Sequence, residues 1–257
     1  MTMAMTMMMN KLGITRTVVK ETYALFATDS HVASALPGWS NCRAIVQISA
    51  ALGARFSQYL ITLNEGGSGE NDTADSSWFV FVVDGTIRLN GVTLQKGGFA
   101  YIPPGHRYRI ESAAAAATAG TGVATLLVFR KPYEALVDHA PPPFFTGHEN
   151  DVAETAFLGD PHARLKVLIP DTPQADMAIN IFTYDPGATL PFVESHVMEH
   201  GMMFLEGGGV YRLDADWHPV TAGDSIWIAA YCPQWFIAAG PGPARYIYYK
   251  DVNRLPA

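Results

Sequence analysis

Short apolar runs separated by turn dipeptides dominate this chain and limit it to an all-β fold. Between residues 44 and 130 the turn signals include Asp84-Gly85, Asn90-Gly91 and Pro103-Pro-Gly. Asn-Gly and Asp-Gly are the dipeptides that tight antiparallel hairpins prefer. The runs between the turns predict five short strands: Gln58–Leu63, Trp78–Val83, Thr86–Leu89, Phe99–Ile102 and Thr125–Phe129. The alanine-rich run Ala113–Ala117 is expected to be a loop inserted into a hairpin.

The same pattern of short apolar runs and turns resumes after a proline-rich segment around Pro141-Pro-Pro. Residues 84–105 and 206–228 share one order of features, from a glycine turn through two short strands to a second glycine turn and an apolar strand. Such self-similarity indicates a tandem repeat. The later strands are expected at Arg164–Ile169, Met177–Tyr184, Gly201–Leu205, Gly209–Leu213, Ser225–Ile228 and Tyr246–Lys250.

The 257 residues, 49% of them apolar, suffice for two domains of about 100–150 residues, each with its own core. We therefore predict two tandem antiparallel β-barrels of the jelly-roll type. The expected division is an N-terminal extension at 1–40, a first barrel at 41–131, an ordered linker at 132–160 and a second barrel at 161–257.

Charge limits the partners of the chain. Its formal net charge is −7, and its 17 Lys and Arg residues form no cluster, so no nucleic-acid partner is expected. No apolar run approaches the roughly 20 residues that span a bilayer, so no membrane partner is expected either. Charged residues amount to 16%, below the usual quarter or so, which favours surface buried in a homo-oligomer.

The cysteines and the N-terminal residues bear on the compartment. Residues 1–10 lack a basic stretch and a small-residue cleavage site, so no signal peptide is expected. Cys42 and Cys232 fit no zinc pattern. We expect both to be free thiols in the cytoplasm.

One segment of the second half contains side chains that commonly bind metal ions. Glu194 and His196 are two residues apart, so on a strand they face the same side, and His200 follows four residues later. Gln234, after Pro233, supplies a further polar side chain from a later strand. One carboxylate, two imidazoles and an amide oxygen suit Mn²⁺, or less well Fe²⁺ or another divalent ion. Glu199, beside His200, is expected to be solvated.

This pattern resembles the cupin superfamily, in which a Gly-flanked His-x-His-x₃-acid motif precedes a later His. Here Glu194 stands at the first His position, His200 at the acidic position and Gln234 at the last His position. Counting back from Gly85, the corresponding first-half residues are Asp72, Ala74 and Trp78, with Tyr108 at the later His position. The first barrel is therefore expected to be a scaffold without a metal site.

The resemblance narrows further. Four segments together look like the (S)-ureidoglycine aminohydrolase family of manganese-dependent bicupins. They are Glu-x-His-x₃-His-Gly, Leu205-Glu-Gly-x-Gly-Val-Tyr-Arg-Leu, Pro233-Gln-Trp and Tyr246-x-Tyr-Tyr-Lys-Asp-Val-Asn-Arg. The resemblance to this family extends over about residues 15–255. The resemblance implies ammonia release from the small molecule (S)-ureidoglycine in purine catabolism.

Family members also place two tyrosines and a lysine near the substrate, which correspond here to Tyr211, Tyr246 and Lys250. Glu194 is expected to relay a proton in addition to binding metal. Strand alternation independently puts Tyr246, Tyr248 and Lys250 on one face. Position 180 carries Asn where family members usually carry His, so the resemblance does not predict the substrate contacts at Asn180.

Two other functions fit the residues. One is another metal-dependent cupin enzyme, an oxygenase or isomerase, acting on a small acid. The other is a cupin that binds a ligand without catalysis.

Overall fold

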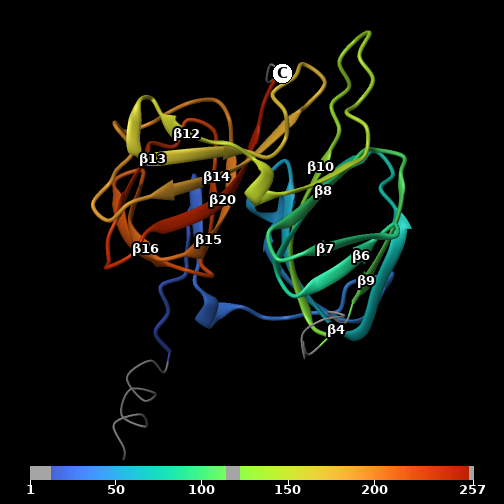
Figure 1. The fold of residues 1–257 in the computed structure, drawn as a ribbon. Coiled ribbons are helices and arrows are strands. Elements are labelled where there is room, and N and C mark those ends of the chain that lie inside the picture. Colours follow the sequence, from blue (N-terminus) through green and yellow to red (C-terminus); the bar gives the residue numbers. More distant parts are fainter. Residues whose placement is uncertain (1–12, 114–121, 255–257) are drawn as a thin grey trace, which may run out of the picture.

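The computed structural model describes residues 13–113 and 122–254, which form two β-barrels (Figure 1). Strands and three short 3-10 turns are the regular structure of these residues. The all-β prediction is confirmed. Most of the alanine-rich run, from residue 114 on, and residues 1–12 of the predicted extension lie outside the described ranges. The 3-10 turns are η1 (Thr28–Ser30), η2 (Ala50–Leu52) and η3 (Glu149–Asp151).

The first barrel is an antiparallel sheet in the order β11-β8-β5-β10-β4-β9-β6-β7, with β3 also paired to β4. Asn90 and Gly91 join β6 to β7 with φ of 47° and 86°, the left-handed conformation that a type I′ turn needs at both positions. Its strands are β3 (Trp39–Ile48), β4 (Ser57–Asp72), β5 (Ser76–Asp84), β6 (Thr86–Leu89), β7 (Val92–Gln95), β8 (Gly98–Ile102), β9 (Arg107–Ser112), β10 (Ala124–Pro132) and β11 (Phe145–His148).

The second barrel combines a long antiparallel sheet, β1-β2-β18-β15-β20-β14-β13-β12, with a smaller one, β17-β16-β19. Its strands are β1 (Val18–Val19), β2 (Tyr23–Phe26), β12 (Glu154–Phe157), β13 (Asp160–Val167), β14 (Met177–Tyr184), β15 (His200–Glu206), β16 (Gly208–Leu213), β17 (Asp216–Thr221), β18 (Ser225–Ile228), β19 (Gln234–Ala238) and β20 (Ala244–Asp251).

Strands from outside the two predicted barrels complete these sheets. β2, from the segment expected to be an extension, pairs with β18 of the second barrel, with Leu25 opposite Ile226. The segment expected to be a linker supplies β11 to the first sheet and β12 to the second. Each added strand covers a sheet edge that would otherwise expose unpaired backbone groups.

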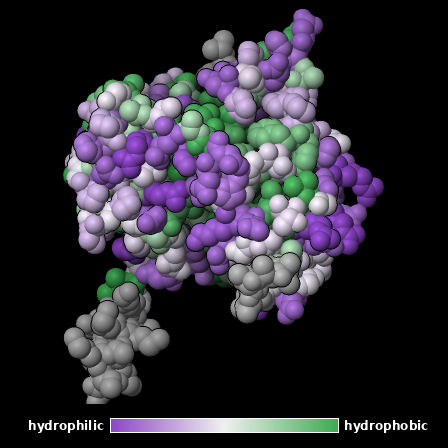
Figure 2. Space-filling model, in the orientation of Figure 1, coloured by the Kyte–Doolittle hydropathy of each residue, from purple (hydrophilic) through white to green (hydrophobic). Residues whose placement is uncertain are grey.

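The two barrels contact each other through a shared apolar cluster. Phe56 and Phe129 of the first barrel pack in it with Met203 and Tyr249 of the second. The ring of Phe56 stacks on Tyr249 with centroids 4.0 Å apart. In the view of Figure 2, apolar surface gathers where the barrels meet. One face of the second barrel's long sheet is thus covered by the first barrel, and its other face lines the interior of the second.

Cys42 and Cys232 are both free. Among the described residues, no helix has the length and apolar character needed to cross a bilayer.

Candidate metal and active site

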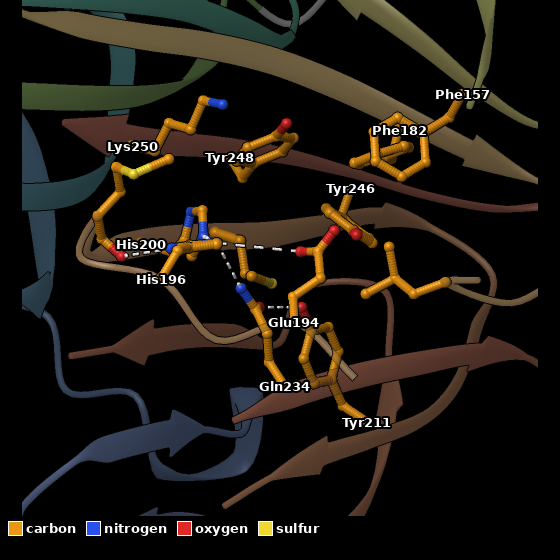
Figure 3. A pocket seen from close by; sticks show the side chains of 13 residues that line it. Phe157, Phe182, Glu194, His196, His200, Tyr211, Gln234, Tyr246, Tyr248 and Lys250 are labelled. Atoms are coloured by element: carbon orange, nitrogen blue, oxygen red, sulfur yellow. Dashed lines mark hydrogen bonds and ion pairs between the residues drawn. The ribbon is translucent and has the colours of Figure 1, made fainter. Parts of the chain in front are cut away.

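The second barrel encloses a cavity of about 120 Å³ (Figure 3). About 10–15 Å³ of such space holds one water, so the cavity accommodates a small molecule. Every side chain predicted to bind metal or substrate lines it: Glu194, His196, His200, Tyr211, Gln234, Tyr246 and Lys250.

Glu194 and Gln234 are neighbours because their backbones form an isolated antiparallel bridge. Each N–H donates to the other carbonyl at 2.9 Å. Glu194 lies in the loop between β14 and β15, whereas Gln234 begins β19. The alternation of Glu194 and His196 suggested a regular strand, but only this bridge forms, and it is enough to bring the carboxylate beside the amide.

His200 and Lys250 occupy directly opposite positions of the β15–β20 pair. In such a pair both side chains point to the same face of the sheet. Tyr246, Tyr248 and Lys250 all line the cavity, whereas Tyr249 belongs to the inter-barrel cluster. The alternation predicted for this strand is confirmed.

The two imidazoles point at each other. The Nε2 atoms of His196 and His200 are 3.1 Å apart, while each Nδ1 faces a backbone carbonyl, that of Met198 at 3.1 Å and that of Tyr249 at 3.2 Å. A carbonyl only accepts, so each Nδ1 carries the hydrogen and leaves an Nε2 lone pair. Burial lowers the pKa of His200 to about 3, which keeps that ring neutral.

Two oxygen-bearing side chains complete the cluster. Glu194 Oε2 lies 3.9 Å from His196 Nε2, and burial raises the pKa of this carboxyl, opposed by His196 and Lys250. The amide nitrogen of Gln234 lies 3.3 Å from His196 Nε2, and its oxygen accepts from the Tyr211 hydroxyl at 2.8 Å. A hydroxyl also accepts hydrogen bonds, so Tyr211 can hold the amide with either end toward the imidazole.

This donor set fits a divalent cation. Two imidazole lone pairs 3.1 Å apart repel unless a cation or a proton lies between them, and both rings are fixed by their Nδ1 bonds. In residues 13–113 and 122–254, no three His, Cys, Asp or Glu side chains form a metal cluster by themselves. Glu194, His196 and His200 are thus not drawn together tightly enough to count as a metal cluster, and the four-ligand set with Gln234 stays a prediction.

Buried tyrosine hydroxyls surround the cluster. Tyr246 and Tyr184 have hydroxyl oxygens 3.3 Å apart. Burial raises the pKa of Tyr211 and of Tyr246 well above the usual range. Both side chains therefore remain protonated, with the Tyr211 hydrogen donated to Gln234 Oε1 and the Tyr246 hydroxyl paired with that of Tyr184.

Tyr248 is a polar cavity residue that the sequence placed on the right face but did not single out. Its hydroxyl accepts a hydrogen bond from Asn180 Nδ2 at 3.0 Å, which leaves its own hydrogen for the cavity. The Asn180 Oδ1 atom is buried and has no partner among the described residues. Asn180, which stands where family members usually have His, thus contacts the cavity indirectly, through its hydrogen bond to Tyr248.

Apolar side chains line the rest of the cavity. Phe157 comes from β12, in the segment predicted as a linker, and its ring meets Phe182 edge-on at 4.9 Å. No motif pointed to these residues, because apolar side chains in strands are indistinguishable from core by sequence. The apolar lining is formed by Phe157, Phe182, Leu190, Met198 and Met202.

The prediction that Glu199 is solvated is wrong, since its exposed fraction is 3%. It accepts the Arg55 backbone N–H at 3.0 Å and the Trp227 indole N–H at 3.3 Å. The physical reason is that it faces away from the cavity, and the first barrel covers that face.

The corresponding region of the first barrel is filled by aromatic rings. Trp78 and Tyr108 have centroids 5.0 Å apart, and Trp39 lies 6.2 Å from Tyr108. Ala74 is exposed at a turn with φ of 50°. His106 stacks on Phe144 at 5.4 Å. These packed rings support the expectation that this barrel acts as a scaffold.

Known proteins resemble this chain over nearly its whole length. The model of the cupin domain family matches residues 180–249. The (S)-ureidoglycine aminohydrolase of Arabidopsis thaliana is 35% identical over 249 residues, which cover 95% of this chain and 80% of that protein. The enzyme of that name from Escherichia coli K12 is 33% identical over 247 residues, 93% of this chain and 92% of that protein. The chain belongs to the (S)-ureidoglycine aminohydrolase family.

Solved structures agree with this membership. The Escherichia coli protein Ylba superposes with a TM-score of 0.83 at 30% identity, covering 96% of this chain and 98% of that one. A putative glyoxylate induced protein from Pseudomonas aeruginosa gives 0.84 at 34% identity, with coverages of 95% and 93%. An oxalate decarboxylase, with a TM-score of 0.67 at 12% identity, shares the fold alone. The bicupin prediction and the family resemblance are both confirmed.

Proposed function

We propose that this chain converts (S)-ureidoglycine and water into (S)-ureidoglycolate and ammonia, using a divalent metal ion held by Glu194, His196, His200 and Gln234. The observation that carries the proposal is the convergence of these donors on His196 Nε2 inside a cavity sized for a small molecule. In the reaction one C–N bond breaks and one C–O bond forms at the same carbon. Membership of the aminohydrolase family supports the choice of substrate.

We expect Mn²⁺ as the physiological metal. A carboxylate, an amide and two imidazoles are harder donors than the thiolates of structural zinc sites, and such sets suit Mn²⁺. A divalent cation bound here supplies Lewis acidity for polarising the substrate and water.

Lys250 is the residue expected to bind the substrate carboxylate. It lines the cavity directly opposite His200 on the neighbouring strand. No acidic side chain among the described residues forms an ion pair with its Nζ. Its charge is therefore available to an anionic substrate held beside the metal ligands.

The tyrosines are suited to the ureido group. Tyr246 is buried and protonated, so its hydroxyl can donate to a carbonyl oxygen. Tyr211 can do the same when the Gln234 amide is turned, so that Tyr211 accepts from the amide nitrogen and frees its own hydrogen. Fixing the ureido group orients the amine toward Glu194. Glu194 would accept a proton from the attacking water and pass it to the departing amine, which leaves as ammonia, so that the carboxylate is regenerated. The apolar wall around Phe157 and Phe182 keeps bulk water from the reacting carbon.

The test is an ammonia-release assay. Ureidoglycine is generated in place from allantoate by its amidohydrolase, and the protein is added after metal removal, with and without Mn²⁺. We expect Mn²⁺-dependent ammonia release faster than spontaneous decay, with (S)-ureidoglycolate as product. No metal-dependent acceleration would reject the proposal. Oxygen consumption with a small acid would point instead to a cupin oxygenase, and binding without turnover to a ligand-binding cupin.

We further propose a cytoplasmic homo-oligomer acting in purine catabolism. An apolar groove of about 630 Å³, bounded by residues 138–145 and 169–174, supports association between copies. Light scattering on the purified chain tests this, because a monomer at working concentrations would contradict it.

A further inference from the structure

A loop of the first barrel reaches the back of the candidate site through Arg55. The Arg55 backbone N–H and Nε lie 3.0 and 3.3 Å from Glu199 Oε1. A terminal guanidinium nitrogen lies 2.7 Å from Asp251 Oδ2. The other oxygen of Asp251 accepts the Glu199 backbone N–H at 2.7 Å. Arg55 therefore ties the residue before β15 to the last residue of β20.

Both carboxylates are buried at this contact. The exposed fractions of Glu199 and Asp251 are 3% and 8%. Buried carboxylates remain charged where donors and cations replace their lost hydration. Arg55 forms an ion pair with each, and the Trp227 indole binds the second oxygen of Glu199. Such a fully bonded group holds its strands in one geometry.

Each carboxylate belongs to the sequence neighbour of a cavity side chain. Glu199 precedes His200, and Asp251 follows Lys250, while His200 and Lys250 are opposite each other across the strand pair. Successive residues of a strand face opposite sides. Fixing the carboxylates on the first-barrel side therefore fixes the direction in which His200 and Lys250 enter the cavity.

Packing beside Arg55 strengthens the connection. Phe56 stacks on Tyr249, the residue whose carbonyl accepts from His200 Nδ1. A Cβ at Gly201 would lie 2.3 Å from the Phe56 ring, so a glycine allows this close approach. The first barrel thus contacts both strands directly behind the site.

We propose that Arg55 is a positioning residue through which the first barrel sets the direction of His200 and Lys250. This inference rests on the proposed function: its metal-affinity part on the proposed metal site alone, and its turnover part on the proposed reaction as well. Residues that orient metal ligands typically change affinity or activity by about 10–100-fold when lost. That is the size of effect expected here.

The experiment uses Arg55→Ala in the full chain, with chemical rescue. Arg55 lines a surface groove of about 440 Å³, which guanidinium ions can enter. We expect Mn²⁺ affinity and kcat each to fall by about 10–100-fold and guanidinium, well below unfolding concentrations, to restore part of both. Arg130→Ala is the matched control, because Arg130 lines the same groove but bonds Ser76 and packs over Trp78. Its Mn²⁺ affinity and kcat should not respond to guanidinium.

Two results would overturn the proposal. One is wild-type Mn²⁺ affinity and kcat in Arg55→Ala, even with a lower Tm. The other is a loss that guanidinium does not restore, which would indicate general damage to the fold. Where Arg55→Ala fails to fold, Glu199→Gln decides, since it keeps the side-chain size and removes the charge that Arg55 pairs with. It should lower Mn²⁺ affinity, and an unchanged affinity would reject the proposal. If ureidoglycine is not the substrate, wild type itself is inactive while the affinity differences persist.

Discussion

The Nε2 atoms of His200 and His196 lie 3.1 Å apart, and a backbone carbonyl holds the Nδ1 of each ring. Both lone pairs are thereby directed at one point. The rings cannot turn away without giving up the carbonyl, and this preorganisation is characteristic of metal-binding imidazoles.

Replacing His200 with Ala should abolish tight Mn²⁺ binding. The loss should exceed the roughly 10–100-fold effect of removing a group that merely orients a ligand. Isothermal titration of the metal-free protein measures it. His218→Ala is the control, because His218 lies on β17 and bonds Tyr23. Equal Mn²⁺ affinities in the two variants would contradict the assigned site.

Replacing Lys250 with Met should separate metal binding from turnover. The side chain keeps most of its length and loses its charge, so metal content should stay at the wild-type level. Turnover, measured as kcat/KM, should fall about 10–100-fold, because a hydrogen bond to a charged group contributes about 1.5–3 kcal/mol. Metal analysis and the ammonia assay provide the two measurements. Lys166→Met, which removes a lysine bonded to the Glu149 carbonyl, should leave both unchanged. Near-normal turnover of Lys250→Met would exclude a role for Lys250.

Substitutions of Asn180 and Tyr248 should have non-additive effects on the free energy of unfolding. Tyr248→Phe leaves the buried Asn180 Nδ2 without its acceptor and should lower the free energy of unfolding by about 1–3 kcal/mol. Adding Asn180→Leu removes the unsatisfied amide and should recover much of that loss. Urea unfolding of the single and double variants measures the coupling. Additive losses would mean that the hydrogen bond contributes little.

Asp185 should stabilise the fold only above strongly acidic pH. Hydrogen bonds from Arg164 and then His162 lower its pKa from 3.8 to about 2. A lowered pKa means that the folded protein binds the proton less tightly than the unfolded chain. Its contribution is therefore present above pH 3.8 and is lost as pH falls toward 2. Acid titration of stability should show Asp185→Asn below wild type near pH 6 and level with it near pH 2. A difference that is constant across this range would contradict the assignment.

Local features were predictable because they depend on neighbouring residues. The Asn90-Gly91 turn follows from the left-handed conformations that these residues tolerate, and the cavity face of Tyr246 and Lys250 follows from strand alternation. The spacing of Glu194, His196 and His200 gave the candidate metal site, even though the first two lie in a loop.

Long-range contacts were not predictable in this way. The pairing of β2 with β18, the entry of Phe157 into the cavity and the burial of Glu199 against Arg55 all join residues distant in sequence. Neither periodicity nor a motif encodes which sheet edge a distant segment will cover. Glu199 has the sequence appearance of a solvated charge, and only the packing of the first barrel makes it a buried one.

Anomalous X-ray scattering at the manganese absorption edge, from crystals grown with Mn²⁺, tests most directly whether the second barrel holds the metal. We expect one strong peak per chain, between His196 and His200 and in contact with Glu194 and Gln234, and no peak within the first barrel. A second-barrel cavity without a peak, or a peak in the first barrel near Trp78 and Tyr108, would contradict it.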